Sequence, residues 1–228
     1  MEILYRSKNA IVVYKPPTIS AQSDLSGDTD IMTLTEEYLA GHGENTRLWL
    51  VHRLDKVVGG VMIFARNPSA AAELSRIMAD HTDVVKRYYA ITEGKITDGY
   101  MEDYIYKDSL SSKAYITDRE RKGVKRCKLY ANSLATVNHE ERELSLVDVE
   151  LYTGRFHQIR AQLSSRKAPI VGDKKYGSRS RIAKMPALFA YGLEIKMKDE
   201  TISVKRLPDL NSYPWSLFAD TLRELGDK

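Results

Sequence analysis

The sequence contains a single cysteine, Cys127, among 228 residues. One thiol excludes an intrachain disulfide and any zinc site built on several cysteines. No segment approaches the ~18 consecutive apolar residues of a transmembrane helix. Residues 1–17 also lack the apolar segment and cleavage site of a secretory signal. These absences predict a soluble, cytoplasmic protein.

Several common catalytic motifs are missing as well. The sequence has neither a G-x-x-x-x-G-K-[ST] phosphate loop nor a G-x-S-x-G nucleophile elbow. Its five histidines show no i, i+4 pairing of the kind that binds a metal on one helix face. We therefore expect neither a metal nor a cofactor.

The net charge of +4 is small, but the basic residues are clustered. Residues 107–128 contain eight basic and three acidic side chains, and residues 166–184 contain seven basic ones and one acidic one, Asp173. Such clusters on a nearly neutral chain favour contact with a polyanion such as RNA. The alternative is that both segments are solvated loops.

The pattern of apolar residues predicts an α+β fold with a large, mixed, mostly antiparallel sheet and flanking helices. A capping box at Thr33 predicts a helix ending near Gly41, Asn67-Pro68 predicts a second helix, and Thr153 is expected to cap a third that ends near residue 165. Gly59-Gly60 reads as a turn. The expected strands cover residues 10–14, 48–51, 61–65, 86–93, 101–106, 113–117, 124–137 and 144–151.

Neither an internal repeat nor a flexible linker interrupts the chain. We therefore expect one domain over residues 1–228, in which the apolar residues of 207–228 form a C-terminal capping helix.

A first candidate site lies in the segment 48–66. If the chain is extended there, Arg53 and Asp55 point to one side, and His52 and Leu54 point to the other. A charged pair that interrupts an apolar strand beside two glycines is a candidate ligand site. The alternative is a surface ion pair at the end of a strand.

A second candidate lies in the helix expected after Thr153. Arg160 would follow Phe156 by one turn and precede Leu163 by nearly one turn, which places it on or beside the apolar face. A buried guanidinium keeps its charge and needs an anion. Asp55 is the candidate partner, and the alternatives are that Arg160 reaches solvent or pairs with a structural carboxylate.

Four motifs in this order resemble those of RluA-type pseudouridine synthases. They are His52-Arg-Leu-Asp55, Lys86-Arg-Tyr88-Tyr-Ala90, Gly154-Arg155-Phe-His157-Gln-Ile-Arg160 and Pro169-Ile-Val-Gly-Asp173-Lys-Lys-Tyr176-Gly177. The resemblance spans roughly residues 3–195. It departs from the family pattern after Asp55, where Val58-Gly59 stands in place of Thr-Ser.

The resemblance implies an isomerase with a central catalytic cleft that converts uridine in ribosomal or transfer RNA to pseudouridine, without a cofactor. It makes Asp55 the catalytic aspartate and Arg160 its partner. It also implies that Arg53 helps to extrude the target uridine and that Tyr88 packs against the base. Whether the aspartate attacks C1′ or removes the 2′ proton stays open.

Because the resemblance begins almost at the first residue, we expect a stand-alone catalytic domain without an S4 RNA-binding domain. We therefore expect the catalytic domain to hold RNA by itself, as a monomer without an obligatory protein partner or membrane contact. The expected RNA-binding residues are Lys122, Lys125, Arg126, Arg155, His157, Lys174 and Lys175. The alternatives are a catalytically silent RNA-binding or ribosome-assembly protein on the same fold and, less favoured, a ribonucleoside hydrolase.

Overall fold

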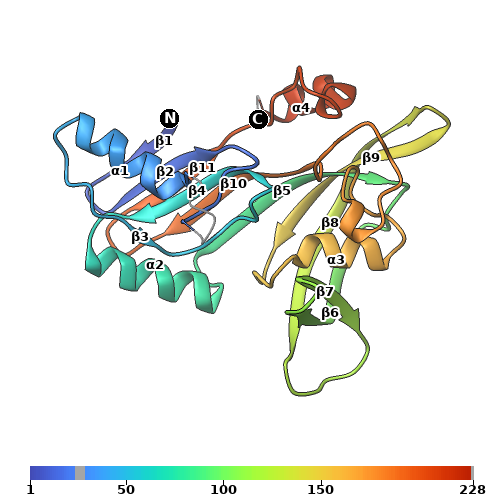
Figure 1. The fold of residues 1–228 in the computed structure, drawn as a ribbon, viewed down its shortest axis with the longest axis horizontal. Coiled ribbons are helices and arrows are strands. Elements are labelled where there is room, and N and C mark those ends of the chain that lie inside the picture. Colours follow the sequence, from blue (N-terminus) through green and yellow to red (C-terminus); the bar gives the residue numbers. More distant parts are fainter. Residues whose placement is uncertain (24–28, 227–228) are drawn as a thin grey trace. The chain divides into compact units, whose positions relative to one another are not determined.

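The structure is a computed structural model that describes residues 1–23 and 29–226 (Figure 1). The chain forms two compact units, which we describe separately. The first comprises Met1–Lys86 and Ala190–Arg206, and the second comprises Arg87–Phe189 and Leu207–Lys228. Whether the two units form the single domain predicted from the sequence stays a prediction.

The first unit is a β-sheet with two helices. Its strands follow the order β1-β2-β4-β10, with β3 paired to β4 and β11 paired to β10. Its elements are β1 (Ile3–Arg6), β2 (Ala10–Lys15), α1 (Ile31–Gly41), β3 (Trp49–Leu50), β4 (Gly59–Ala65), α2 (Pro68–Asp80), most of β10 (Leu188–Lys196) and β11 (Thr201–Lys205).

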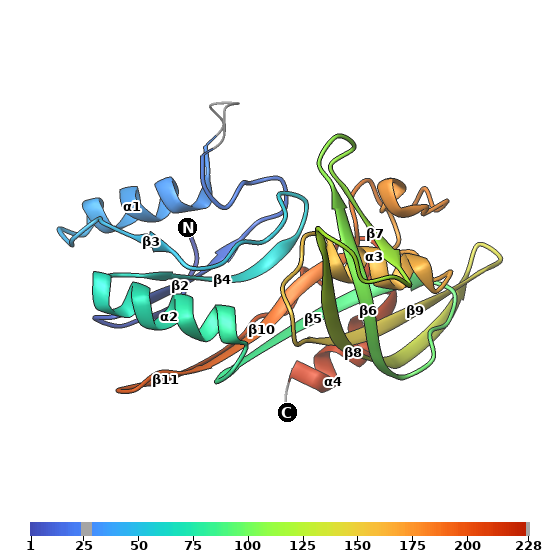
Figure 2. The ribbon, with the colours of Figure 1, turned by 90° about the horizontal axis from the view of Figure 1, so that it is seen from below.

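The apolar core of the first unit lies between α2 and the sheet. Leu74 and Ile77 of α2 are fully buried there against Val12 and Ile63 of the strands. Figures 1 and 2 show α1 on the other side of these strands. Both faces of β2 and β4 are therefore covered, which is why these strands read as continuous apolar runs.

The helix boundaries follow the capping residues. Asn67 caps α2 by accepting a hydrogen bond from the backbone N–H of Ala70, as predicted. The prediction for α1 was wrong at its start: Asp30 is the N-cap and accepts from the backbone N–H of Thr33. The predicted end of α1 near Gly41 is confirmed.

The Gly59-Gly60 turn was a wrong prediction, because both glycines begin β4. Gly60 has a φ of +138° and lies so close to the backbone of Ala190 that a Cβ atom would overlap it. The glycine is therefore required by close packing of two strands rather than by a turn. The turn itself falls at residues 56–57.

The second unit is an antiparallel sheet in the order β5-β9-β8-β6-β7. Figure 2 shows its long strands beside α3. Its elements are most of β5 (Val84–Glu93), β6 (Gly99–Asp108), β7 (Lys113–Thr117), β8 (Val124–His139), β9 (Arg142–Leu151), α3 (Gln158–Ser165), the 3-10 helices η1 (Lys174–Tyr176) and η2 (Trp215–Phe218), and α4 (Ala219–Gly226).

Helix α3 covers one face of this sheet. Ala161 of α3 packs with Ile105, Ala114 and Cys127 of the strands. The register of β5, β9, β8 and β6 puts Tyr88 on the same face, because directly paired residues in an antiparallel sheet point to the same side. The opposite face carries the alternate residues of each strand.

The third predicted helix starts later than expected. Its N-cap is His157 rather than Thr153, and its end at Ser165 is as predicted. At the C-terminus the helix proper covers only Ala219–Gly226, after η2. Leu222 is fully buried, as expected for an apolar terminal segment.

The predicted α+β class with mostly antiparallel strands and flanking helices is confirmed. Within the described residues, no helix is both long enough and apolar enough to cross a membrane.

Candidate active site

Residues 52–56 of the first unit run between β3 and β4 without regular secondary structure. The carbonyl of Asp55 accepts a hydrogen bond of 2.9 Å from the backbone N–H of Val58, which closes the turn before β4. Leu54 is buried, Arg53 is exposed and Asp55 is partly buried. This alternation agrees with the extended run predicted from the sequence.

His52 fixes this run to β4. Its Nε2 atom accepts a hydrogen bond of 3.0 Å from the backbone N–H of Ile63. Desolvation of the ring and, second, the positive charge of Lys86 lower the pKa of His52 to about 4. The imidazole is therefore neutral at physiological pH and can act as an acceptor throughout.

Lys15 fixes the run from its other end. Its side chain is fully buried, and its Nζ atom donates to the carbonyls of Ile19 at 2.7 Å, Pro16 at 3.0 Å and Lys56 at 3.3 Å. Burial lowers the pKa of Lys15 to about 8, and the attraction of the Asp55 carboxylate opposes that shift. The first unit thus brings a buried ammonium group into the electrostatic field of Asp55.

Tyr88 lies on β5 in the second unit and is 9% exposed. It is paired with Val149 of β9 and shares the face of the sheet that α3 covers. Its neighbour Arg87 points to the opposite face and forms ion pairs with Asp148 at 3.2 Å and Glu150 at 2.8 Å. Tyr88 is thus an aromatic wall on the α3 side of the sheet.

The start of α3 is held by side chains rather than by a conventional N-cap. Gln158 is buried; its Oε1 accepts from the Thr153 hydroxyl at 2.8 Å and from the Arg155 backbone N–H at 3.0 Å. His157 adopts a left-handed backbone conformation, and its Nδ1 atom lies 2.9 Å from the hydroxyl of Tyr176. The motif around His157 therefore builds a rigid entry to the helix.

Arg160 lies within α3 and is buried, as expected from its place on the apolar face. Its Nε and Nη2 atoms donate to the two carboxylate oxygens of Asp173 at 2.6 and 2.9 Å. Its guanidinium also lies 4.9 Å from the ring centre of Tyr176. The alternative that Arg160 pairs with a structural carboxylate is confirmed. A pairing with Asp55 would join the two units and stays a prediction.

The residues expected to bind RNA occupy two places in the second unit. Lys122, Lys125 and Arg126 are exposed on and before β8, and Lys174 and Lys175 are exposed on η1. Arg155 is partly buried and its Nε donates to the carbonyl of Arg126 at 3.2 Å, which ties α3 to the first of these groups.

Sequence reasoning missed Lys15, Gln158 and Asp173 as positioning residues. Asp173 did carry a signal, because it is the only acidic residue in the basic segment 166–184. Its partner, however, is Arg160, which lies outside that segment, so the pairing itself could not be read from the cluster. Lys15 carried no such signal, since a lysine at the end of a strand is usually exposed.

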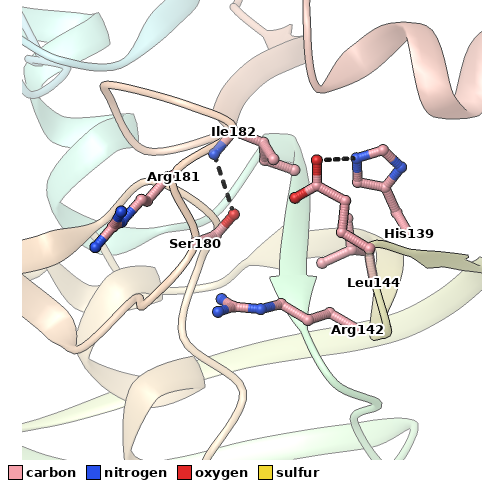
Figure 3. A pocket seen from close by; sticks show the side chains of 7 residues that line it. His139, Arg142, Leu144, Ser180, Arg181 and Ile182 are labelled. Carbon is pink, nitrogen blue, oxygen red and sulfur yellow. Dashed lines mark hydrogen bonds and ion pairs between the residues drawn. The ribbon is translucent and has the colours of Figure 1, made fainter.

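A separate pocket of about 100 Å³ lies in the second unit (Figure 3). It is lined by His139, Glu140, Arg142, Leu144, Ser180, Arg181 and Ile182. His139 and Glu140 lie 3.7 Å apart there. None of the predicted site residues lines this pocket. In residues 1–23 and 29–226, no three His, Cys, Asp or Glu side chains are grouped to hold a metal ion.

Comparison with known proteins matches this chain to one family. A family model described as RNA pseudouridylate synthase matches residues 9–165. The chain is 32% identical over 194 residues to the uncharacterized RNA pseudouridine synthase YhcT of Bacillus subtilis, covering 83% of this chain and 62% of that protein. It is 30% identical over 217 residues to an uncharacterized RNA pseudouridine synthase of Haemophilus influenzae, covering 93% and 90%.

A third relative is the ribosomal large subunit pseudouridine synthase C of Rickettsia conorii, 28% identical over 200 residues. The chain spans 63% of that protein. Among solved structures, human RNA pseudouridylate synthase domain containing 1 matches 92% of this chain and 83% of its own, with a TM-score of 0.76 and 24% identity. At that identity the likeness shows the fold alone.

Proposed function

Since the chain belongs to the RNA pseudouridylate synthase family, we propose that it isomerises specific uridines in structured RNA, ribosomal or transfer, with Asp55 as the catalytic carboxylate. The observation that carries this proposal is the rigid placement of Asp55. His52 and Lys15 fix the backbone on both sides of it, and the residue between Arg53 and Asp55, Leu54, is buried. A preorganised, partly buried carboxylate is what nucleophilic or base catalysis requires.

The reaction is an isomerisation, so every atom of the uridine is kept. The N1–C1′ bond breaks, the base rotates, a C5–C1′ bond forms, and the C5 proton is finally lost while N1 gains one. Asp55 either attacks C1′ or removes the 2′ proton, and both routes need an ionised carboxylate. The reaction consumes no oxidant, reductant or second substrate, so the proposed mechanism includes no cofactor.

We assign the other site residues from the family resemblance. Arg53, exposed beside Asp55, helps to extrude the target uridine. Tyr88 packs against the detached base. Arg160, whose Nε–Nη2 edge binds Asp173, supports the charge on Asp55. A guanidinium offers five N–H donors, enough for two carboxylates.

A base inside an RNA helix is out of reach, so it must be flipped out at a cost of a few kcal/mol. We propose that Lys122, Lys125, Arg126, Arg155, His157, Lys174 and Lys175 hold the surrounding phosphates. Relatives named for the large ribosomal subunit favour ribosomal RNA as the substrate. We also propose that the protein acts in the cytoplasm as a monomer and needs no obligatory protein partner.

The experiment incubates the purified protein with total RNA from cells that lack it and measures pseudouridine and free uracil. A synthase yields pseudouridine, a hydrolase yields uracil, and a silent RNA-binding protein yields neither.

We expect Asp55→Asn to reduce pseudouridine formation below detection while RNA affinity changes by less than about tenfold, or ~1.4 kcal/mol. Asp80→Asn is the matched control, because Asp80 is an exposed aspartate at the end of α2. Substantial activity in purified Asp55→Asn protein would refute the catalytic assignment.

A further inference from the structure

The face of the second unit's sheet opposite Tyr88 and α3 carries a group of tyrosines on β6, β7 and β8 that are not buried. We call this set the tyrosine face: Tyr100, Tyr104 and Tyr106 on β6, Tyr115 on β7 and Tyr130 on β8. The register places them together, because Tyr100 is paired with Tyr130 and Tyr106 is paired with Tyr115. The rings of Tyr100 and Tyr130 meet edge to face with their centres 5.1 Å apart.

The rings of the tyrosine face are open to solvent. Tyr100, at the start of β6, is 61% exposed, and Tyr115, on the edge strand β7, is 43% exposed. Tyr104, Tyr106 and Tyr130 are partly exposed. A contiguous exposed aromatic surface of this kind marks an interaction site.

A cation lies over each of four of these rings. The charged groups of Lys128, Arg126, Arg121 and Lys113 lie 4.4, 5.5, 5.6 and 5.2 Å from the ring centres of Tyr100, Tyr104, Tyr106 and Tyr115, respectively. Alternating rings and cations match the alternating bases and phosphates of a nucleic acid strand.

Carboxylates also lie on this surface, among them Glu150, which is paired with Tyr130 and is held by Arg87 at 2.8 Å. Glu102 binds Lys128 at 2.8 Å, and Glu120 lies 3.7 Å from Arg126. Both pairs are largely exposed, and such pairs contribute only about 0–1 kcal/mol. A phosphate can therefore replace either carboxylate at small cost.

The spacing of the rings favours a single strand of nucleic acid over a duplex. Alternate residues on one strand lie about 6.6 Å apart, whereas stacked bases in a helix rise only about 3.4 Å. Neighbouring rings therefore cannot serve consecutive bases of a duplex, but they can each take one base of an unstacked single strand.

We propose that the tyrosine face binds a single-stranded segment of the RNA substrate by base stacking. The register puts this face on the other side of the sheet from Tyr88, so the bound segment is not the nucleotide that reacts. The inference rests on the proposed function for the choice of RNA, and it adds a second contact that selects RNAs with a single strand beside the target.

The test measures binding in Asp55→Asn protein, so that turnover does not enter. The probe is a labelled single-stranded RNA of about 12 nucleotides, compared with a duplex of the same sequence. Tyr100→Ala with Tyr115→Ala removes the two most exposed rings. We expect affinity for the single strand to fall at least ~10-fold with an unchanged salt dependence, because the rings carry no charge.

Tyr213→Ala is the matched control, because Tyr213 is 46% exposed but lies outside the tyrosine face. Tyr100→Phe with Tyr115→Phe keeps the rings and should keep the affinity. If the alanine pair misfolds, photocrosslinking of bromouridine-substituted RNA to the intact tyrosine face gives an independent result, with adducts expected at Tyr100 or Tyr115.

Equal affinity in the alanine pair and the control would overturn the proposal, as would equal binding of duplex and single strand, or adducts found only elsewhere. A change in sedimentation mass with unchanged RNA affinity would instead make this face a protein interface, and would also overturn it. Pseudouridine formation by the unaltered protein is measured separately. Its absence would count against the proposed function and not against the tyrosine face.

Discussion

Replacing Asp173 with Asn tests the ion pair that holds Arg160 within α3. The two side chains are 6% and 1% exposed, and two hydrogen bonds of 2.6 and 2.9 Å join them. An asparagine has one carbonyl oxygen and no charge, so the buried guanidinium would lose the negative charge and the paired acceptor geometry that Asp173 supplies. Removing one partner of a buried pair costs about 3–5 kcal/mol of the free energy of unfolding.

For a chain of this length, that loss corresponds to a melting temperature lower by ~6–20 °C. Arg160→Met should cost a similar amount. The double variant should be more stable than the sum of the two losses predicts, by on the order of 2 kcal/mol, because neither charge is then left alone. Asp220→Asn is the matched control, since Asp220 pairs with Arg223 at 2.8 Å but is 94% exposed, and it should cost less than ~1 kcal/mol.

The positions of the two tryptophans allow the effects of the Asp173 and Arg160 variants to be measured in the second unit alone. Trp49 lies in the first unit, and Trp215 is buried in the second, which also holds Arg160 and Asp173. In a Trp49→Phe background, the fluorescence of Trp215 reports urea unfolding of the second unit alone. Losses for the single variants that add to within ~0.5 kcal/mol in the double variant would refute a coupled buried pair.

Three further predictions concern other parts of the structure. The folded pKa of His52, about 4, lies below its unfolded value. The unfolded chain therefore binds an extra proton between pH 6.5 and 4, and the free energy of unfolding should fall by up to about 3 kcal/mol as the pH drops through this range. In urea titrations at several pH values, His52→Gln should remove this part of the pH dependence, and an unchanged pH dependence would contradict the role of a neutral acceptor. Gly60→Ala should destabilise the first unit strongly, because the added Cβ meets the backbone of Ala190; a melting temperature equal to that of the parent protein would count against the close approach. Changing Lys122, Lys125 and Arg126 together to Ser should reduce the slope of log affinity for single-stranded RNA against log salt by up to ~2; if slope and affinity both stay the same, the RNA runs elsewhere, and Lys174, Lys175 and Arg179 are the next residues to replace.

The sequence was most informative where one local interaction decides the structure. Asn67-Pro68 begins α2 because the cap and the proline both act within one turn. The pattern also located eight of the strands to within a few residues, since apolar runs and alternation depend on burial, but it missed β1, β10 and β11. It failed at Thr33, where Asp30 is the cap instead, and at Thr153, whose hydroxyl donates to the Gln158 side chain rather than capping the helix.

Gly60 shows why some local readings fail. Two adjacent glycines are typical of a turn, but here the second is required by Ala190, which is 130 residues away in the sequence. Lys15 is similar, because its burial depends on three carbonyls that converge only after folding. Neither contact leaves a local pattern that a single sequence could reveal.

Arg160 raises the same problem within the site itself. Its place on the apolar face predicted a buried cation that needs an anion, but the sequence could not choose between Asp55 and a structural carboxylate. The observed bond to Asp173 uses one edge of the guanidinium, so the two alternatives do not exclude each other. A cation that is already held by Asp173 has a fixed orientation before substrate binds.

In the proposed mechanism, that fixed orientation lets Arg160 support Asp55 without reorganisation during the reaction, because preorganised charges stabilise a developing transition state most effectively. On this reasoning Asp173 is a positioning residue for the chemistry, acting through Arg160 rather than on the uridine.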